Sequence, residues 1–404
     1  MSSEQSKHIC LNCLLKPYLN NAFIFGFYLQ ITSNCGTNQS STFVPKFLKW
    51  CYCPIIEFFL WEHFFLMSWQ TIPVLSRSAP CVASYSVIKK GLATFKMIGI
   101  FLSFVGASNF TIVKRNAIIL DIRLRHSFFH NKMAHVIINN VCLLVSVIVI
   151  AFQFSLAIVN LFTLYPLWQK DKLYKYEEIF CSMEYGMWIS FLISEIAYLF
   201  LLAGIIGFVT VKEYQQLSKE LTLLLRNSNH LRLKLEEFMS HHQELWDFIS
   251  IINNKLYFLV LVVHIYLTFG TCFAYYMYLF LGIDKAFEFI LLGLIIIGTI
   301  VCIIYGFLVC WIAFTMENTF QDIRRYAGFN LSLQMKLKIL NFMKRFGTVA
   351  LTLSIGGVLD VTKRFPFQLA KTLHSIFSGL LKLRDVSYKR RRCDEISIHN
   401  RTVF

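Results

Sequence analysis

Residues 286–313 read AFEFILLGLIIIGTIVCIIYGFLVCWIA and carry a single charged residue, Glu288. A helix needs about 20 predominantly apolar residues to cross the hydrocarbon core of a bilayer, and this stretch exceeds that length. The whole chain agrees, because 56% of its 404 residues are hydrophobic. Only 15% are charged, against roughly 25% in an average soluble domain. The sequence therefore indicates a membrane protein and excludes most soluble enzymes.

Six further segments are largely apolar and long enough to span. The predicted spans cover about 44–69, 92–113, 134–165, 187–211, 256–281, 286–313 and 348–383. A shorter apolar patch at 19–31 cannot span, and we predict an interfacial or re-entrant helix there. The predicted fold class is therefore all-α, with seven transmembrane helices and long cytoplasmic helical extensions.

The distribution of Lys and Arg orients these spans. The N-terminal segment and the segments 114–133, 212–255 and 314–347 hold more Lys and Arg than the loops on the other side. The positive-inside rule therefore predicts a cytoplasmic N-terminus, which has no apolar core typical of a signal peptide. The basic YKRRRC tail would then lie outside, against the rule, and glycosylation at the Asn400 sequon would support that placement.

The net charge of +16 and the cysteines also limit the function classes. In a chain this apolar, the basic residues are best explained by loops beside anionic lipid, so we predict membrane lipid and no nucleic acid as a partner. Cys10 and Cys13 form a lone CxxC with no second pair, which predicts no metal site. No catalytic motif is present, so we predict neither an enzyme nor a cofactor.

Two cytoplasmic segments are predicted to form helices. Residues 212–255 contain no Gly or Pro, and apolar residues recur there in alternating steps of three and four from Tyr214 to Ile252. This pattern predicts one long amphipathic helix, packed on its own chain or on other subunits rather than on the membrane surface. Segment 314–347 repeats the pattern, and its apolar positions are Phe320, Ile323, Ala327, Leu331, Leu337, Leu340 and Met343.

The last predicted span is unusually polar. Its polar residues follow one another in steps of four and three, which places them on one helical face. They are Arg364, Gln368, Lys371, Ser375, Ser378 and Lys382. Lipid cannot satisfy such a face, and a charge inside the membrane costs at least about 2.5 to 3.5 kcal/mol. The face is predicted to line a water-filled pore between subunits, and the alternative is packing against polar residues of the same chain.

These features together resemble the insect gustatory and odorant receptor superfamily across nearly the whole chain. LLKPYLNNAFIFGFYLQ (14–30) and HHQELWDFISIINNKLYFLVLVV (241–263) are similar to the gustatory branch. Ser375-Ile376 and Lys382-Leu383 stand where gustatory receptors usually show Thr-Tyr and Gln-Phe, so the identities differ. Lys371 and the stretch SIFSGL (375–380) are similar to the odorant branch instead. We favour a gustatory receptor, with an odorant receptor subunit that works with a co-receptor as the alternative.

The resemblance implies a tetrameric, ligand-gated, nonselective cation channel in the plasma membrane of a sensory neuron, detecting a small-molecule tastant or odorant. The predicted spans divide the chain into a cytoplasmic N-terminal segment with the short interfacial helix (1–43), spans 1–4 (44–211), an anchor helix (212–255), spans 5–6 (256–313), a second anchor helix (314–347), the pore-lining span (348–383) and a basic tail (384–404). A ring of Lys382 would repel cations, so this subunit either joins different subunits or turns Lys382 from the axis.

The resemblance also implies a ligand pocket in the outer half of spans 2 to 6. The candidate residues are Lys96, Trp188, Glu195, Tyr198, Phe273 and Tyr276. Glu195 lies about eight residues into span 4, where an acid needs a partner or a water-filled cavity. Both a pocket residue and an ion pair with Lys96 remain open.

Two other classes of membrane protein fit less well. A G-protein-coupled receptor would show an Asp-Arg-Tyr-like triplet after span 3 and an Asn-Pro-x-x-Tyr in span 7, and this sequence has neither. Its predicted orientation in the membrane is also the opposite one. A transporter would show repeated, Gly- or Pro-interrupted spans, and the sequence has no internal repeat.

Overall fold

The computed structural model describes most of the chain in two compact units. One unit comprises Met1–Val263 and Leu308–Lys363, and the other comprises His264–Phe307 and Arg364–Phe404. We call them unit 1 and unit 2 and treat each by itself. The residues described are 9–24, 31–32, 46–69, 92–115, 118–119, 123–130, 132–168, 175–226, 231–255, 257–280, 285–326, 332–347, 354–355, 359–360 and 364–401.

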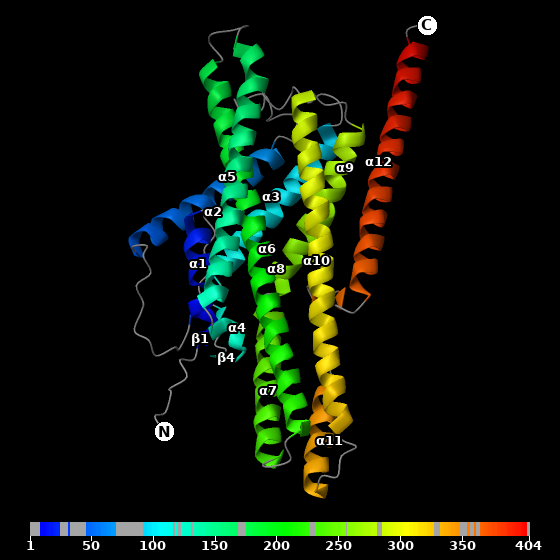
Figure 1. The fold of residues 1–404 in the computed structure, drawn as a ribbon. Helices are drawn as coiled ribbons and strands as arrows, with labels where there is room; N and C mark the ends of the chain where they lie inside the picture. Colours follow the sequence, from blue (N-terminus) through cyan, green and yellow to red (C-terminus); the bar gives the residue numbers. More distant parts are fainter. Residues whose placement is uncertain are drawn as a thin grey trace. The chain divides into compact units, whose positions relative to one another are not determined.

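The described residues are almost entirely helical (Figure 1), which confirms the predicted all-α class. The helices are α1 (Leu11–Ile24), α2 (Lys46–Trp69), α3 (Leu92–Arg115), α4 (Ser127–His130), α5 (Lys132–Trp168), α6 (Lys175–Arg226), α7 (Leu231–Lys255), α8 (Tyr257–Ile265), the π-helix η3 (Tyr266–Gly270), α9 (Thr271–Phe280), α10 (Lys285–Tyr326), α11 (Leu333–Gly347) and α12 (Phe365–Arg401).

Three two-residue strand pairs accompany the helices. The strands β1 (Ile9–Cys10) and β4 (Arg123–Leu124) pair antiparallel, as do β5 (Ser354–Ile355) and β6 (Leu359–Asp360). The strands β2 (Ile31–Thr32) and β3 (Ile118–Ile119) pair in parallel. These pairs tie connecting segments together and form no larger sheet among the described residues.

Four helices in the described part of the chain are long and apolar enough to cross a membrane. The candidate spans are Met133–Ser155, Gly186–Leu223, Val260–Phe280 and Leu291–Thr319. These ranges overlap the third to sixth predicted spans, and the first two predicted spans coincide with the helices α2 and α3. The chain is a multi-pass membrane protein.

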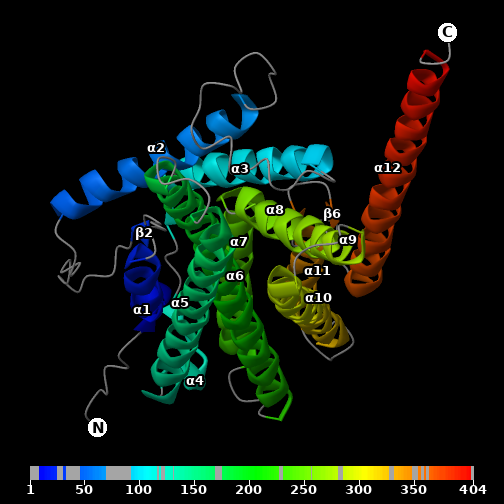
Figure 2. The ribbon, with the colours of Figure 1, turned by 90° about the horizontal axis from the view of Figure 1, so that it is seen from above.

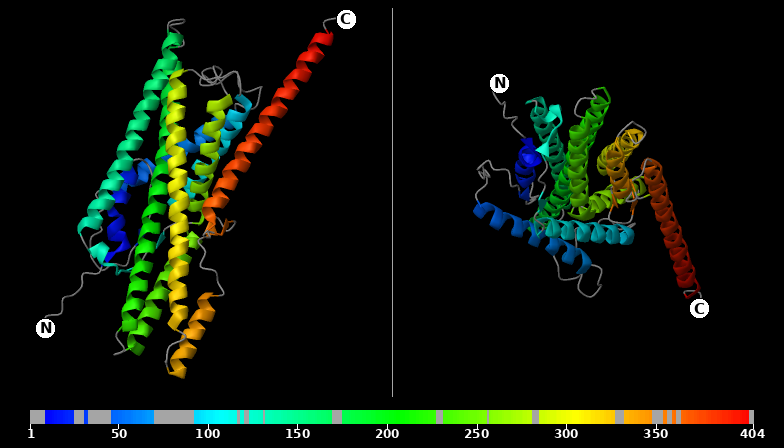
Figure 3. Two further views of the ribbon diagram at one scale, coloured as in Figure 1. Left: turned by 45° about the vertical axis from the view of Figure 1, so that its right-hand side comes forward. Right: turned by 90° about the horizontal axis from the view of Figure 1, so that it is seen from below.

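Unit 1 has an aromatic and aliphatic core between neighbouring helices. The helices α2 and α3 lie side by side, as Figure 2 shows, and α5 runs along α6 (Figure 3). Residues of α1, α2, α3 and α6 form one buried cluster, which comprises Phe23, Cys53, Ile56, Leu60, Ala107, Phe110, Trp188 and Leu192. Large apolar side chains that are exposed on α5, such as Leu143 at 60% and Phe154 at 66%, are suited to contact lipid.

The helix near the N-terminus differs from the predicted interfacial helix at 19–31. The helix α1 begins at Leu11, and Leu14, Leu15 and Tyr18 are fully buried. The Tyr18 hydroxyl donates a hydrogen bond to the carbonyl oxygen of Tyr198 on α6 at 2.9 Å. Contact with α5 and α6 therefore buries this helix in the protein, because its apolar face finds partner helices.

The predicted single helix over 212–255 is two helices. The helix α6 ends at Arg226 and α7 begins at Leu231, and the two contact each other along their lengths. The apolar stripe is buried between these helices and their neighbours, as at Leu217, Leu221, Leu235, Phe238 and Leu245.

The last predicted span, 348–383, is not one helix either. The pair β5–β6 occupies part of 348–364, and α12 begins at Phe365 and continues beyond 383 to Arg401. The Arg364 carbonyl oxygen accepts hydrogen bonds from the backbone N–H groups of Phe367 and Gln368, at 3.0 and 3.1 Å. Pro366 suits this first turn, since its missing N–H would have no helical partner there.

Candidate functional site

The polar face of α12 lies on the surface of unit 2. Arg364 precedes the helix, and the predicted pore-lining residues follow along it at helical spacing. Arg364, Gln368, Lys371, Ser375 and Lys382 are exposed, and Ser378 is half-buried. The opposite face packs inward, because Phe365, Leu369 and Leu380 are all at most 8% exposed. The helix is therefore amphipathic inside the chain, with its polar side outward.

The start of α12 is anchored by aromatic rings of unit 2. Phe365 packs against Tyr305 of α10, with ring centroids 5.8 Å apart, and against His264 of α8 at 6.1 Å. Further along, the Cys272 thiol donates a hydrogen bond to the Leu373 carbonyl oxygen at 3.3 Å. At the middle of α12, the Arg384 guanidinium lies 4.3 Å from the Phe280 ring centroid. These contacts fix which face of α12 remains exposed.

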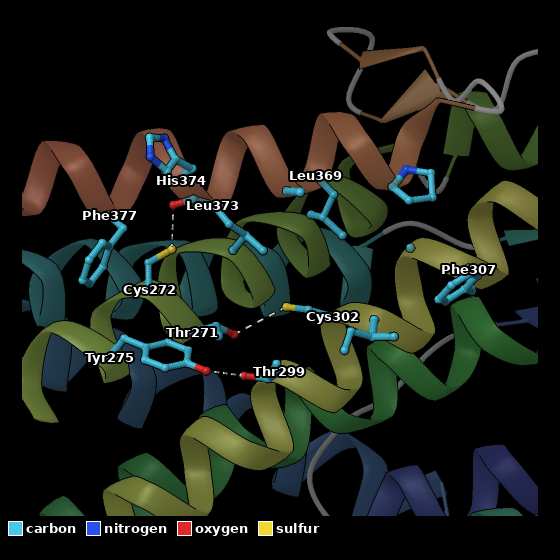
Figure 4. A pocket seen from close by; sticks show the side chains of 14 residues that line it. Thr271, Cys272, Tyr275, Thr299, Cys302, Phe307, Leu369, Leu373, His374 and Phe377 are labelled. Carbon is cyan, nitrogen blue, oxygen red and sulfur yellow. Dashed lines mark hydrogen bonds between the residues drawn. The ribbon is translucent and has the colours of Figure 1, made fainter.

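A pocket of about 470 Å³ lies between α9, α10 and α12, entirely within unit 2 (Figure 4). Its lining is almost wholly apolar and includes two threonines, two cysteines, a tyrosine and a histidine. The lining residues are Thr271, Cys272, Tyr275, Thr299, Cys302, Ile303, Gly306, Phe307, Pro366, Leu369, Ala370, Leu373, His374 and Phe377. The volume falls in the range of pockets that hold small organic molecules.

The π-helix η3 directly precedes the pocket. Its wider turn is followed by Thr271, whose backbone N–H is shared between the carbonyl oxygens of Leu267 and Thr268. The Cys302 thiol of α10 donates to the Leu267 carbonyl oxygen at 3.4 Å. Single π turns inside helices occur frequently at functional sites. Here the turn sets the rotational position at which Thr271 and Cys272 reach the pocket.

The predicted ligand-pocket residues divide between the two units. Trp188, Glu195 and Tyr198 belong to unit 1, whereas Phe273 and Tyr276 belong to unit 2. Tyr198 is fully buried, Tyr276 is 7% exposed and Phe273 is half-buried. Lys96 lies on α3, and its side chain is outside the described part of the structure.

Glu195 is buried to 3% exposure and has a polar partner on a neighbouring helix. Its Oε1 accepts a short hydrogen bond from the Asn109 side-chain amide of α3. Its Oε2 and the Asn109 Oδ1 have no hydrogen-bond partner among the described residues. A buried carboxyl with one unoccupied oxygen can receive a further donor, and this keeps Glu195 a candidate for ligand recognition.

The two aromatic candidates on α6 have clear packing roles. The Trp188 ring stacks on the His63 ring of α2, with centroids 4.3 Å apart and planes at 26°. The Tyr198 hydroxyl hydrogen-bonds the Ser146 hydroxyl of α5 at 2.8 Å. Gln153 of α5 likewise donates to the Ser194 hydroxyl at 3.2 Å. Polar side chains in these spans therefore tie helices to one another.

A second polar cluster joins α6 to α7 and to the segment before α4; we call it the Glu213 clamp. The fully buried Glu213 carboxylate accepts backbone N–H bonds from Arg125 and His126, each at 3.1 Å. His241 of α7 lies 3.7 Å from Glu213 and 3.5 Å from Glu220. Arg125 pairs with Glu244 at 3.4 Å. The clamp therefore binds three separate chain segments.

Two histidines at the clamp have shifted pKa values in opposite directions. Burial alone would lower the pKa of His241, but the Glu213 and Glu220 carboxylates outweigh it and raise the pKa above its ordinary value. Burial, with His241 beside it, lowers the pKa of His242 to about 4. His242 packs against the Phe342 ring of α11 with centroids 5.0 Å apart. Although adjacent in sequence, the two histidines therefore face different environments.

Several of these residues were not among the predicted site residues. Asn109, Thr271 and Cys302 are ordinary small residues in apolar runs, and only their contacts with distant segments distinguish them. Glu213 follows the apolar run of span 4 by two residues and stands beside Lys212, so the sequence marks it only as one of several polar residues there. Among the described residues, no group of three or more His, Cys, Asp or Glu could hold a metal ion.

The chain resembles solved structures of an insect receptor. The insect olfactory receptor OR5 from Machilis hrabei in complex with eugenol matches with a TM-score of 0.58 and 12% identity, over 92% of this chain and 98% of that one. A second structure of the same receptor matches with a TM-score of 0.57 and 12% identity, over 92% of this chain and 98% of that one. No protein-family profile matches, and no curated protein sequence does. The chain therefore has the insect olfactory receptor fold, which bears out the resemblance at the level of the fold.

Proposed function

We propose that this chain is a subunit of a ligand-gated cation channel of the insect chemoreceptor superfamily, with a gustatory receptor as the favoured branch. The observation that carries the proposal is the exposed polar face of α12, in a chain with the olfactory receptor fold. Lipid cannot hydrogen-bond this face, so it needs water or another subunit beside it. A pore shared between subunits supplies both.

The proposed pore wall comprises the six predicted residues Arg364, Gln368, Lys371, Ser375, Ser378 and Lys382. Rings of hydroxyl and amide groups can replace part of an ion's hydration shell, whereas rings of lysine repel cations. Lys382 is exposed near the end of this face. The subunit therefore conducts cations best beside different subunits that contribute fewer positive charges.

Assembly into a tetramer is supported by a second exposed feature. Leu333, Leu337 and Leu340 of α11 follow a helical spacing and are 75%, 50% and 59% exposed. They lie in the second predicted cytoplasmic anchor segment, 314–347, where such an apolar stripe favours contact with another protein surface. The predicted stripe on this segment is thus exposed at Leu337 and Leu340, while Met335, Ile339 and Phe342 face inward.

The proposed ligand is a small tastant or odorant, and Glu195 is the best-supported recognition residue. Glu195 lies within the candidate span Gly186–Leu223 of α6, its Oε1 accepts from Asn109 of α3, and its Oε2 has no partner among the described residues. Lys96, Trp188 and Tyr198 of the same unit are the further proposed ligand contacts, and Phe273 and Tyr276 of unit 2 stay predictions from the sequence. Glu195→Gln should shift the ligand dose-response if the carboxyl meets ligand; an unchanged response with reduced surface expression would favour a structural role.

The decisive experiment is expression of the chain in cells that lack chemoreceptors, with and without an odorant co-receptor, while ligand-evoked current is recorded. Current from the chain alone supports a gustatory receptor, and current only with the co-receptor supports an odorant receptor. Lys382→Gln should increase cation current several-fold wherever current is seen. An absence of current in both settings, despite surface expression, would count against the channel.

The odorant alternative rests on its own observations. Lys371 and the stretch SIFSGL (375–380) are similar to odorant receptors, and both lie on α12. The solved structures with the same fold are also of an olfactory receptor. The co-receptor arm of the same experiment separates the two branches.

A further inference from the structure

The pocket of unit 2 lies behind the proposed pore wall. Its α12 residues are Pro366, Leu369, Ala370, Leu373, His374 and Phe377, and none of them belongs to the predicted pore-lining set. One helix thus presents a polar face outward and an apolar face to a cavity. Any molecule in this cavity would touch the helix that we assign to the pore.

The Thr271 hydroxyl and the two cysteine thiols of the pocket lining already have partners. The Thr271 hydroxyl and the Cys302 sulfur lie 3.5 Å apart, and the Cys302 thiol also reaches the Leu267 carbonyl oxygen at 3.4 Å. The Cys272 thiol is bonded to the Leu373 carbonyl oxygen at 3.3 Å, as Figure 4 shows. Water inside the pocket would find few free donors or acceptors, so the cavity favours an apolar occupant.

Two walls of the pocket approach each other closely at Gly306. A Cβ at Gly306 of α10 would lie 3.3 Å from the Leu369 Cδ2 atom and 4.0 Å from the Pro366 Cα atom. Glycine therefore lets α10 approach the first turn of α12, and a larger residue would push the two helices apart. This contact holds the α10 and α12 walls of the pocket close together beside Leu369.

Besides the exposed His374 imidazole, a pair of hydroxyl groups lies on the lining. The Tyr275 and Thr299 hydroxyls hydrogen-bond each other at 3.0 Å, and Tyr275 is 37% exposed. Either hydroxyl can turn to donate to, or accept from, one polar group of a ligand. The hydrocarbon chain of a lipid has no such group, whereas a small alcohol, phenol, ketone or ester has one.

We propose that this pocket is a binding site for a small, neutral, mostly hydrocarbon molecule with at most one polar group. It is a separate site from the ligand pocket proposed around Glu195, since all its lining residues belong to α9, α10 and α12. An occupant would contact Leu369, Leu373 and Phe377 and so stabilise one position of α12. The binding claim stands on the cavity alone, and only its effect on current rests on the proposed channel function.

The test uses the purified full-length chain in phospholipid nanodiscs and a photoactivatable adamantane diazirine as the probe. After irradiation, digestion and mass spectrometry locate the adducts. We expect adducts on the lining residues of α9, α10 and α12, with Tyr275, Ile303 and Leu373 prominent. Excess unlabelled adamantane should remove them. Because no current is recorded, a failed channel proposal leaves this result interpretable.

Two variants fill the pocket from different walls, so that misfolding of one does not decide the outcome. Ala370→Phe enlarges the α12 wall and Ile303→Trp enlarges the α10 wall; both positions are exposed and tolerate bulk better than a buried site. Each should lose the pocket adducts and keep the elution profile of the native chain. Gly293→Phe on α10 is the matched control, because a Cβ there meets no atom within 4 Å and the residue does not line the pocket.

Three outcomes would overturn the proposal. The first is the absence of adducts on the lining residues, and the second is labelling that persists in both filled variants. The third comes from a parallel sample with a phospholipid that carries the diazirine on its acyl chain. If only that lipid labels the pocket, the cavity is a lipid groove and not a site for a small molecule.

Discussion

The Glu213 clamp and the polar face of α12 both hold charged residues in a largely apolar chain, but they differ in how these residues are stabilised. At the clamp, Glu213 and His241 are at most 1% exposed, and backbone N–H groups and opposite charges of the same chain surround them. On α12, Lys371 and Lys382 are exposed. Buried charges here are paired within the subunit, whereas the α12 charges point to partners or water outside it.

The largest expected effect comes from breaking the clamp. Glu213→Ala removes the acceptor for the Arg125 and His126 backbone N–H groups and leaves His241 buried without this carboxylate. Removing one partner of a buried pair costs about 3 to 5 kcal/mol of stability. We expect a strongly lowered melting temperature of the detergent-solubilised protein, measured by size-exclusion chromatography after heating.

Glu237→Ala is the matched control for the clamp variant. Glu237 lies 3.9 Å from Arg125, but its side chain is 74% exposed. Exposed ion pairs contribute little, so its melting temperature should stay near that of the native chain. Equal losses in both variants would contradict the distinction between buried and exposed charges.

The next effect is a pH dependence set by His242. Its pKa is about 4 in the folded protein because burial disfavours the charged ring, against an ordinary value of about 6.5. Because this pKa is lowered, the contribution of neutral His242 to the free energy of unfolding is complete above pH about 6.5. It is lost as the pH falls towards 4, and the loss is roughly 3 kcal/mol. His242→Phe should flatten the fall in melting temperature between these pH values.

Gln243→Leu serves as the control for this titration, since Gln243 is exposed beside His242 and does not titrate. Its pH profile should follow the native one. His241 acts in the opposite sense: its pKa is raised, so its contribution is present below its ordinary pKa and declines as the pH rises above it. A native profile that is flat below pH 6.5 would contradict the burial of His242 as a neutral ring.

A smaller effect is expected at an exposed ion pair between α7 and α11. The Lys338 ammonium lies 2.7 Å from the Glu236 carboxylate, and the two side chains are 44% and 37% exposed. Lys338→Ala should destabilise by about 0.2 to 1 kcal/mol, and less at high salt. Melting temperatures at low and high salt measure this, and a loss as large as that of Glu213→Ala would show the pair to be part of the buried network.

The smallest effect on stability is expected on α12 itself. Lys371 is exposed, so Lys371→Leu should change the free energy of unfolding by no more than about 0.5 kcal/mol. The same change should alter ligand-evoked current, because it removes a charge from the proposed pore wall. A large loss of stability in the separated subunit would instead place Lys371 in contacts within its own chain.

The sequence predicted the helical class because spans of apolar residues and three-four spacing are local signals. Tyr214, Leu217 and Phe238 are buried where the stripe places them, and the step pattern from Arg364 to Lys382 lies on the exposed side of α12. The end of α6 and the start of α12 were missed. Both helix ends depend on the balance between weak helix propensities of single residues and tertiary contacts, and a hydropathy pattern contains no information on that balance.

The site was harder to predict than the fold. Asn109 meets Glu195, and Cys272 meets Leu373, across long separations along the chain. The π-helix η3 sits in an apolar run without a residue that marks it, so its effect on Thr271 is invisible in the sequence. Cavities likewise arise from side chains on three helices, and no single helix carries their pattern.

The unbroken length of α6 has a mechanical consequence. At 1.5 Å per residue, its 52 residues form a rod of about 78 Å, well over twice the thickness of a hydrocarbon core. Glu195 and Glu213 are separated by a whole number of helical turns, about five, and so project from the same side of the rod roughly 27 Å apart. A twist of the rod imposed at Glu195 would turn Glu213 through the same angle. Rotation of this one helix about its axis would therefore couple the Glu195 carboxyl to the Glu213 clamp without any change in secondary structure.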